Sequence, residues 1–591
     1  MTVLTFLGPL LFGISALIGA YNRKVSYLAL SVSSIVFAVT QFNSGNILSY
    51  YAVISSVVWV FSGIYSLSYG MKYGRWLASL LSLTVLGMSL ILISSNYLML
   101  LAGWEIMSVP SYAIVALNKM QRGPAFTFMT FSELSTAFII AGSISAYALS
   151  GDLSFSYQPL SSILPLLLIS FGSLIKMGMS PFMISEWLPI AHGNAPANAS
   201  AVFSATMTLM GVFLITKMLF LTAQSVATVY VGVLFLIIGS ISILFSSIYA
   251  YISENMKMLG GFSTIENQGA ILNAFGLYLI ASTAILKEFV LATIIIFTLS
   301  HSISKTGLFL SVGSTRGEYF GESKAPGDRW MRVGTLLSTM SLSGLFPTIG
   351  GLAVWMLLES FFMQAYLGGF LGIIAIVVGS VIAISEGMAT GAMIKVLSFS
   401  ALFRAKKGTA PKTETVTIFS VGAALLFIFL ISTLLVPKMF VSGLPAVFVL
   451  NGFTIESAFS GSDFGLISPV YVAALITVFS VSAYAIFGRP RTRTLPEWNS
   501  GRMITSEYTS FGYANNIRLM LRRILRTRFG NSKQPITVID VFWFVIVSAG
   551  RNYRRFSGYF ARKFMNSSIG WYMIYMIVAF MVVIILGSFI Q

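Results

Sequence analysis

The chain has 591 residues, of which 56% are hydrophobic and only 9% are charged, whereas soluble domains carry about 25% charged residues. The 36 Lys and Arg outnumber the 18 Asp and Glu, so the formal net charge is +18. This composition excludes a soluble enzyme, a nucleic-acid-binding protein and a disordered scaffold, and it indicates an all-α polytopic membrane protein.

Sixteen stretches of mostly apolar residues are long enough to cross a bilayer, which takes about 20 residues per helix. The predicted spans are 3–20, 26–42, 49–69, 76–93, 96–117, 125–149, 162–183, 199–219, 227–249, 260–279, 288–313, 334–357, 371–398, 415–436, 466–487 and 570–590. We interpret the first stretch as a span and not as a signal peptide, because no basic segment precedes it and no clear cleavage site follows it.

The distribution of basic residues supports this count, because loops on the cytoplasmic side of a membrane are enriched in Lys and Arg. With the N-terminus outside, 30 of the 36 Lys and Arg fall in predicted cytoplasmic loops, and fifteen of these lie between Arg489 and Lys563. One miscounted span would invert every later loop and destroy this separation. The positive charge therefore marks the cytoplasmic face, and it requires no nucleic acid partner.

The C-terminal region contains one apolar stretch, residues 536–549, that is short for a span and includes Asp540. We predict that it forms a lateral amphipathic helix along the cytoplasmic face and leads into the terminal span. Before it, Arg518, Arg522 and Arg526 recur every four residues and share one helix face. This basic stripe has two open interpretations: a segment that faces lipid, or a strut along a partner subunit or along this protein's own helices.

Ionisable side chains inside a bilayer are costly and usually face a polar interior, a partner helix or an ion path. Five stand out within the predicted spans: Glu105, Glu133, Lys176, Lys305 and Lys395. His301 precedes Lys305 by one helical turn, so these two share a face. A structural ion pair is the alternative for Lys176 and Lys305, and snorkelling towards the membrane surface is the alternative for Lys395. Buried lysines suit proton relay, because burial disfavours their charged form and a nearby carboxylate favours it again.

At these positions the sequence resembles a known family, the antiporter-like subunits of respiratory complex I, Mrp antiporters and membrane-bound hydrogenases. The matching stretches are GWEIMSVPSYAIVALNK (103–119), KMGMSPFMISEWLPIAHGNAPANASA (176–201), ENMKMLGGFSTIENQG (254–269), SHSISKTGLFLSVGS (300–314) and MIKVLSFSALF (393–403). Together they make the resemblance cover most of residues 95–405. The I-E-N-Q-G turn and the tail at 498–524 are similar to the formate hydrogenlyase and hydrogenase-4 type of subunit.

The resemblance implies a fold of about 16 transmembrane helices with two inverted five-helix repeats, each containing a broken helix. A C-terminal lateral helix and a terminal span would follow the repeats. The implied divisions are N-terminal helices (1–94), a first antiporter-like repeat (95–249), a second repeat (250–413), additional helices (414–488), a basic segment with the lateral helix (489–569) and the terminal span (570–591).

The resemblance also implies roles for individual residues in a proton relay. Glu105 would be the modulating carboxylate paired with Lys176, the switching lysine of the first half-channel. His301 and Lys305 would occupy the broken helix of the second repeat and connect along the bilayer midplane. Lys395 would pass the proton on near an exit. The auxiliary candidates are Glu133, Lys217, Lys257, Glu266 and Glu386.

Two departures from the family pattern bear on this relay. Many relatives have Lys or His in the span after the first broken helix, where this sequence has Ser204 and Leu209. Near 347–355 the family's glutamate is missing from PTIGGLAVW. The link between the half-channels would then run through water, hydroxyls or a side chain that the sequence does not identify, with Glu133 and Glu386 as possible substitutes.

The resemblance implies a proton-translocating subunit of a complex I-like or hydrogenase-type oxidoreductase, in the cytoplasmic membrane of a prokaryote. The chain has no Cys and only two His, so no thiolate-held cluster can form within it and no metal site is expected. Fe–S, Ni–Fe or flavin cofactors are expected only in partner subunits. The other expected partners are membrane lipids and protons or Na⁺. Two alternatives stay open: a Mrp-type secondary Na⁺/H⁺ antiporter, and a scaffold with a degenerate ion path.

Overall fold

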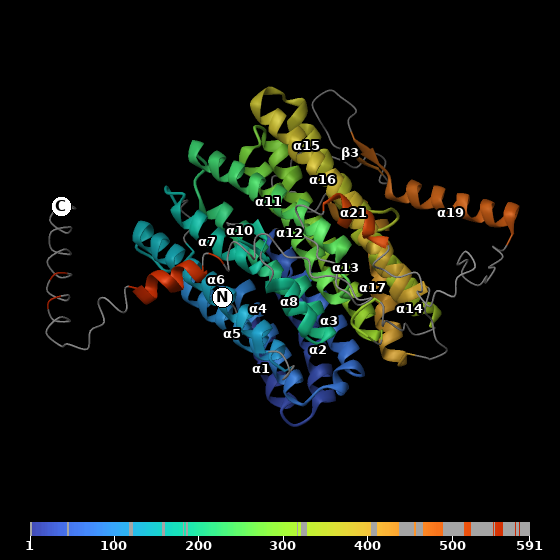
Figure 1. Cartoon of the computed structure of the whole chain (residues 1–591), viewed down its shortest axis with the longest axis horizontal. Coiled ribbons are helices and arrows are strands. Elements are labelled where there is room, and N and C mark those ends of the chain that lie inside the picture. Colours follow the sequence, from blue (N-terminus) through green and yellow to red (C-terminus); the bar gives the residue numbers. More distant parts are fainter. Residues whose placement is uncertain are drawn as a thin grey trace. The chain divides into compact units, whose positions relative to one another are not determined.

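The computed structural model is almost entirely α-helical, which confirms the predicted fold class (Figure 1). It describes residues 3–43, 46–117, 122–155, 160–180, 183–184, 187–315, 317–320, 328–402, 410–436, 454–456, 465–488 and 513–521, and positions 548, 550–559, 574 and 578. In these ranges strands occur only as two antiparallel pairs, β1 Met179–Ser180 with β2 Met183–Ile184 and β3 Ile455–Glu456 with β4 Leu466–Ile467. The chain separates into two units, Met1–Asn515 and Asn516–Gln591.

Fourteen of the sixteen predicted spans coincide with apolar helices, eleven of which are long enough to cross a membrane, while three are shorter. The span predicted at 260–279 coincides with a longer and more polar helix, α12 Met256–Ile280. The span predicted at 570–590 and the lateral helix predicted at 536–549 lie outside the described residues, apart from isolated positions. Of the basic stripe, the structure describes only Arg518, in the short helix α21 Asn515–Met520.

The first four helices pack against one another through small residues. They are α1 Leu7–Gly19, α2 Arg23–Gln41, α3 Leu48–Ser66 and α4 Trp76–Leu92, with 3₁₀ turns at Val3–Phe6 and Tyr69–Lys72. The Ser15 hydroxyl on α1 donates to the Ser26 carbonyl on α2 at 2.9 Å and lies 3.0 Å from the Ser82 hydroxyl on α4. Small residues allow helices to approach closely in a membrane, where hydroxyls also bond across helices. These apolar spans therefore tolerate many buried serines.

The next group of helices contains the first broken span. Its members are α5 Tyr97–Val115, α6 Arg122–Ser150, α7 Leu164–Lys176, α8 Trp187–Asn194, α9 Ala197–Val202, α10 Thr208–Leu221 and α11 Val226–Ile252. The helix is interrupted just after Lys176, where Gly178 adopts a φ of +86° that suits glycine. A Cβ at this position would lie 2.7 Å from the Leu188 side chain. Between α9 and α10 the chain forms a π-helical turn, Phe203–Met207.

A second broken span lies further along the chain, in the group α12, α13 Ala284–Ser314, α14 Arg329–Leu342, α15 Ile349–Tyr366 and α16 Gly369–Val396. Three hydrogen bonds follow one another in antiparallel order between α13 and the pair α14–α15: Ser311 with Thr335, Ser304 with Ser341, and Thr293 with Ser360. The helices α14 and α15 are therefore the two halves of one span, which the sequence predicted as the single stretch 334–357. The break between them contains Gly344, with a φ of +63°.

This second break corrects one prediction made for the relay. His301 and Lys305 were expected in the broken helix of the second repeat. Both lie instead in α13, which is continuous over 31 residues, so that expectation is wrong. The broken span runs beside α13, and its own break contains no ionisable side chain between Ser343 and Thr348. The Gly-x-x-Pro pattern of the first break recurs at Gly344 and Pro347, whereas α13 has no proline, so the sequence contained a signal that the resemblance to the family outweighed.

The contacts between loops agree with the predicted topology, in which successive loops lie on alternate sides of the membrane. Loops predicted to be cytoplasmic are joined by the ion pairs Lys257–Glu318 at 2.9 Å and Lys72–Glu414 at 3.4 Å. Segments predicted to be outside are joined by backbone hydrogen bonds from Leu160 to Leu221 and from Tyr97 to Leu153. The loops thus fall into the two sets that the basic residues predicted.

The described part of the first unit ends with α17 Lys412–Leu430, α18 Ser432–Leu435 and α19 Pro469–Phe487. Helix α17 packs closely on α14, where a Cβ on Gly422 would lie 2.8 Å from the Gly334 Cα. Helix α19 is strongly apolar, yet Phe479 and Phe487 are exposed within the unit. In a membrane such a face contacts lipid or a partner subunit.

Candidate functional site

The first candidate lysine, Lys176, ends α7 directly before the first break and is buried. Its Nζ donates hydrogen bonds to the Ser108 hydroxyl on α5 at 2.8 Å and to the Ser132 hydroxyl on α6 at 3.1 Å. The rings of Trp104 and Phe128 each lie 5.7 Å from Nζ, where their faces attract an ammonium group. Two hydroxyls and two aromatic rings therefore hold the head of this lysine.

Glu105 was predicted to pair with Lys176, but among the described residues the two form no ion pair. The Glu105 carboxylate accepts a 2.6 Å hydrogen bond from the Thr136 hydroxyl instead. The two residues still interact electrostatically, and Ser108 stands one helical turn after Glu105 on α5. Hydroxyls on α5 and α6 therefore contact each ionisable group separately: Thr136 bonds the carboxylate, and Ser108 and Ser132 bond the ammonium. The sequence did not identify these hydroxyls as functional.

These hydroxyls lead to a first prediction. Replacing Ser108 or Ser132 with alanine removes one hydrogen bond to the ammonium group, and such bonds contribute roughly 1.5–3 kcal/mol. Proton uptake by reconstituted vesicles should therefore fall by about tenfold in each variant, since a factor of ten corresponds to ~1.4 kcal/mol. Ser170→Ala, on the same α7 helix, is the matched control, because its buried hydroxyl has no hydrogen-bond partner among the described residues. Equal uptake in all three variants would contradict the role of these serines.

The second candidate lysine, Lys305, is fully buried on α13. Its Nζ donates to the Gly260 carbonyl of α12 at 3.2 Å. The same carbonyl accepts a 2.8 Å hydrogen bond from the Thr264 hydroxyl, and this hydroxyl lies 2.6 Å from that of Ser204. A continuous set of polar contacts therefore runs from Lys305 across α12 to the helix that follows the first break.

The other end of this set of contacts is the π-helical turn Phe203–Met207. The His301 Nε2 lies 3.3 Å from the Ser204 carbonyl, and the Ser302 hydroxyl donates to the Ala205 carbonyl at 2.8 Å. A π-helical turn disturbs the regular helix ladder and is frequent at functional sites, and here two neighbouring carbonyls accept bonds from α13. Of the two residues predicted to replace the family's Lys or His, Ser204 therefore contacts α12 and α13, whereas Leu209 is buried and apolar.

His192, at the end of α8, was not selected from the sequence, although it closes the W-L-P-x-A-H stretch. It is fully buried, and neither ring nitrogen has a hydrogen-bond partner among the described residues. Its ring lies 4.8 Å from that of Phe309 and interacts electrostatically with Lys305 and Lys257. His192 therefore lies between Lys305, in the middle of α13, and Lys257, at the start of α12.

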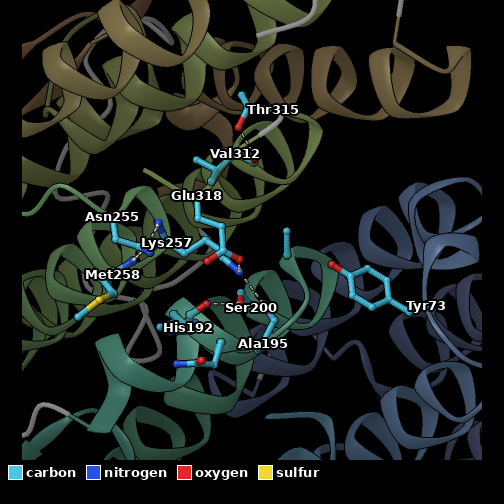
Figure 2. Close-up of polar contacts among 12 residues, drawn as sticks. Tyr73, His192, Ala195, Ser200, Asn255, Lys257, Met258, Val312, Thr315 and Glu318 are labelled. Atoms are coloured by element: carbon cyan, nitrogen blue, oxygen red, sulfur yellow. Dashed lines mark hydrogen bonds and ion pairs between the residues drawn. The ribbon is translucent and has the colours of Figure 1, made fainter. Parts of the chain in front are cut away.

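Lys257, an auxiliary candidate, lies at this loop end (Figure 2). Its Nζ forms a 2.9 Å ion pair with Glu318 and donates to the Ala195 carbonyl at 3.2 Å. Figure 2 shows His192 beside these contacts, with its own carbonyl accepting a hydrogen bond from Ser200. Glu318 is more than half exposed, so this cluster connects the surface at the loop end with the buried ring of His192.

Lys395 is fully buried, which argues against the snorkelling alternative. Its Nζ forms a 3.1 Å ion pair with Glu254 and donates to the Ser253 carbonyl at 2.7 Å. The Phe320 ring lies 4.9 Å away. The sequence reading missed Glu254, because it belongs to a loop between α11 and α12. The ion pair ties the end of α16 to that loop.

The remaining auxiliary candidates occupy different environments. Lys217 donates to the Ser94 carbonyl at 2.6 Å and lies 3.6 Å from the Phe155 ring, towards the segments predicted to be outside. Glu133 is exposed on α6, beside Ser132. Glu266 is buried on α12, and Glu386 is partly buried on α16. In the described part of the chain, no three His, Cys, Asp or Glu side chains are grouped so that they could hold a metal ion.

Three curated proteins with related sequences extend the picture. The chain is 26% identical over 473 residues to hydrogenase-4 component B of Escherichia coli (strain K12), covering 73% of this chain and 69% of that protein. It is 27% identical over 274 residues to formate hydrogenlyase subunit 3 of the same organism, covering 44% and 43%. It is 32% identical over 211 residues to NADH-quinone oxidoreductase subunit N of Ectopseudomonas mendocina (strain ymp), covering 34% and 41%. The match therefore spans less than half the length of the last two.

Solved structures share the fold. A chain of the archaeal membrane-bound sulfane sulfur reductase superposes with a TM-score of 0.77 at 15% identity, covering 98% of this chain and 99% of that one. A chain of the Mrp complex from Dietzia sp. gives 0.69 at 15% identity, covering 100% and 63%. A chain of respiratory complex I from Thermus thermophilus gives 0.56 at 17% identity, covering 74% and 100%.

The same relationship appears at the level of the protein family. Residues 94–382, which contain Glu105, Lys176, His301 and Lys305, match the family described as NADH:quinone oxidoreductase/Mrp antiporter, transmembrane region. With the helix order and the buried lysines described above, this match confirms the resemblance drawn from the sequence. The chain is thus similar to the antiporter-like membrane subunits of complex I, Mrp antiporters and hydrogenase complexes, and residues 94–382 carry the pattern of that family.

Proposed function

We propose that this chain is the proton-translocating subunit of a membrane-bound oxidoreductase. Partner subunits would carry out electron transfer, and this chain would move protons through its buried lysines and carboxylates. The proposal rests on the surroundings of Lys176 and Lys305. Both are buried, and among the described residues neither forms an ion pair with a carboxylate; they contact hydroxyls and a carbonyl.

This arrangement suits a switch better than it suits a structural ion pair. A structural pair would lock each ammonium against a carboxylate, as it does for Lys395 and Glu254. Lys176 instead interacts with Glu105 and Glu133 only at a distance. At an effective dielectric near 20, a charge a few ångströms away changes the energy of the ammonium by roughly 4 kcal/mol. Movement of one nearby charge is therefore sufficient to change the protonation of such a lysine.

The contacts also suggest a route between the two lysines. Hydroxyl groups both donate and accept hydrogen bonds, so Ser204 and Thr264 can pass a proton towards Lys305. The Gly260 carbonyl that Thr264 and Lys305 both contact only accepts hydrogen bonds, so the last step would require a water molecule or a movement of the Lys305 side chain. His192, Lys257 and Glu318 would give this route an opening at the loop end predicted to be cytoplasmic. Lys395 would act near an exit, where its pairing with Glu254 would have to open.

The partners and the setting follow from the same proposal. The names of the relatives place them in hydrogenase, formate hydrogenlyase and NADH–quinone oxidoreductase complexes. We accordingly propose that this chain assembles with other membrane and peripheral subunits, which hold Fe–S, Ni–Fe or flavin cofactors. The chain would lie in the cytoplasmic membrane of a prokaryote with its N-terminus outside, as the 30 basic residues in alternate loops suggest.

The proposal can be tested on the native complex. An affinity tag on this chain would allow the complex to be purified, and mass spectrometry would identify its other subunits. The complex is then reconstituted into vesicles that contain a pH-sensitive dye, and turnover is started with the electron donor of the co-purified module. We expect dye-reported proton movement that a protonophore abolishes. Electron transfer without proton movement, or movement that requires Na⁺, would contradict the proposal.

A further inference from the structure

Helix α12 carries a buried carboxylate, Glu266, an auxiliary candidate from the sequence to which the proposed route assigns no step. Its side chain is only 2% exposed. The Ser263 hydroxyl lies beside it one turn earlier, but neither carboxylate oxygen has a well-formed hydrogen bond among the described residues. A buried ionised carboxylate without partners is costly, and it is costlier still within a membrane. Such a group is expected to hold a proton, or to exchange one, and not to serve as a simple structural acid.

A second carboxylate, Glu386 on α16, acts on the first. Glu266 interacts electrostatically with both Glu386 and Lys305. Glu386 lies close to Gly344, since a Cβ added to that glycine would be 3.6 Å from the Glu386 Oε2. The Glu386 carboxylate therefore lies at the break between α14 and α15.

The second break differs from the first in the ionisable side chains that lie at it. An interrupted helix leaves backbone groups free to interact with ions or water. The first break begins directly after a lysine, Lys176, whereas the second contains no ionisable side chain of its own from Ser343 to Thr348. A carboxylate is supplied at the second break from outside the broken span, by Glu386 on α16.

Glu105 and Glu266 occupy corresponding positions in the order of the helices. In chain order, α5, α6 and the broken α7–α8 are matched by α12, α13 and the broken α14–α15. Glu105 lies on the helix two before the first broken span, and Glu266 lies on the helix two before the second. In each group, a carboxylate on that helix interacts electrostatically with the buried lysine.

We propose that Glu266 and Glu386 form a proton-binding carboxyl pair at the second break, which exchanges protons with Lys305. The inference rests on the proposed function and adds a site to it. Two carboxylates close together cannot both remain ionised, so the pair holds one proton and can accept another. In the exchange with Lys305, an N–H bond of the ammonium breaks and an O–H bond forms on Glu266. An ammonium and a carboxylate become an amine and a carboxylic acid, and the net charge does not change.

The pair can be detected without any pumping assay. Dicyclohexylcarbodiimide reacts with protonated carboxyl groups in apolar surroundings, and mass spectrometry locates the modified residue. With the purified native complex near neutral pH in potassium buffer, we expect modification of Glu266 or Glu386 and none of Glu359 on α15. Absence of label from both members of the pair would overturn the proposal. Protection of the pair by Na⁺ would also overturn it, since the pair would then bind sodium.

A second experiment tests whether the pair takes part in translocation. Glu266→Gln and Glu386→Gln should each lower the number of protons moved per electron pair by about a hundredfold, the lower end of the range for loss of a proton-transferring group. Glu359→Gln removes a carboxylate from the same broken span and should retain the wild-type ratio. If the unmodified complex moves no protons, the proposed function fails, and the labelling result is still interpretable. If it moves protons and both variants match it, only the carboxyl pair is refuted.

Discussion

Replacing Lys176 with alanine is expected to abolish proton translocation while the complex still assembles. The variant removes the only ionisable group of the first broken span that contacts both α5 and α6 through hydrogen bonds in the described structure. Neither Ser108 nor Ser132 can take over its charge change, because a hydroxyl does not ionise in this range. Loss of a proton-transferring group lowers rates by about a hundredfold or more. Dye-reported proton uptake in reconstituted vesicles measures the effect.

The control for this prediction is Lys287→Ala. Lys287 begins α13 in a more exposed position, where it hydrogen-bonds Gln224. It has the same chemistry as Lys176, but it has no part in the proposed relay. Assembly is checked by comparing the yield and subunit composition of the two purified variants. Wild-type uptake by the Lys176 variant would remove this residue from the relay, whereas a comparable loss in both variants would indicate a general effect of lysine removal.

Much of the fold could be predicted because the membrane imposes strong constraints on the sequence. Apolar length located fourteen of the described spans, and basic residues sorted the loops into two sets that the ion pairs of Lys257 and Lys72 respect. The break after Lys176 could be predicted, because Gly178 and a proline follow it within a few residues. The second break was not predicted, although Gly344 and Pro347 repeat the spacing of Gly178 and Pro181, because they lie inside one apolar stretch whose total length suits a single helix.

The sequence identified the charged residues of the candidate site but not its neutral ones. Lysines and carboxylates stand out against an apolar background, so Lys176, Lys305 and Lys395 were found from the sequence. Serine and threonine are common throughout these helices, since they fit close helix packing as well as proton paths. The role of Ser204 and Thr264 depends on how the π-helical turn Phe203–Met207 meets α12, and that is decided by packing. His192 was overlooked because a single histidine on a short helix shows no periodicity.

In this arrangement the groups whose charge can change are different from the groups that connect them by hydrogen bonds. Lysines and carboxylates supply the sites whose charge can change, and hydroxyls and carbonyls supply the connections between them. Among the described residues, Lys257 and Lys395, both near loop ends, are the lysines of the proposed relay that form direct ion pairs. These ion pairs can stabilise the fold, while Lys176 and Lys305 have no ion-paired carboxylate within the described part of the chain that would fix their protonation.

The connection between the two halves provides the second prediction with a large expected effect. Thr264→Val keeps the volume of the side chain but removes the hydroxyl that lies 2.6 Å from Ser204 and donates to the Gly260 carbonyl. Without it, the polar contacts between Ser204 and Lys305 are interrupted in a buried region. Proton translocation should fall by about tenfold or more, because a proton cannot cross an apolar gap without a donor or acceptor. Ser204→Ala should have a similar effect, and the double variant should add little to either, since both remove the same link.

The matched control is Thr206→Val, in the same π-helical turn as Ser204. Its hydroxyl is buried and bonds the Val202 carbonyl and the Trp59 ring nitrogen, so the substitution makes the same chemical change at a place outside the link. The measurements are protons moved per electron pair, for translocation, and the thermal unfolding temperature of the purified complex, for the fold. Loss of translocation in Thr264→Val with normal unfolding, alongside a pumping Thr206→Val, supports the hydroxyl link. A Thr264→Val variant that pumps normally would mean that protons pass between the halves by another route, one that does not use Ser204 and Thr264.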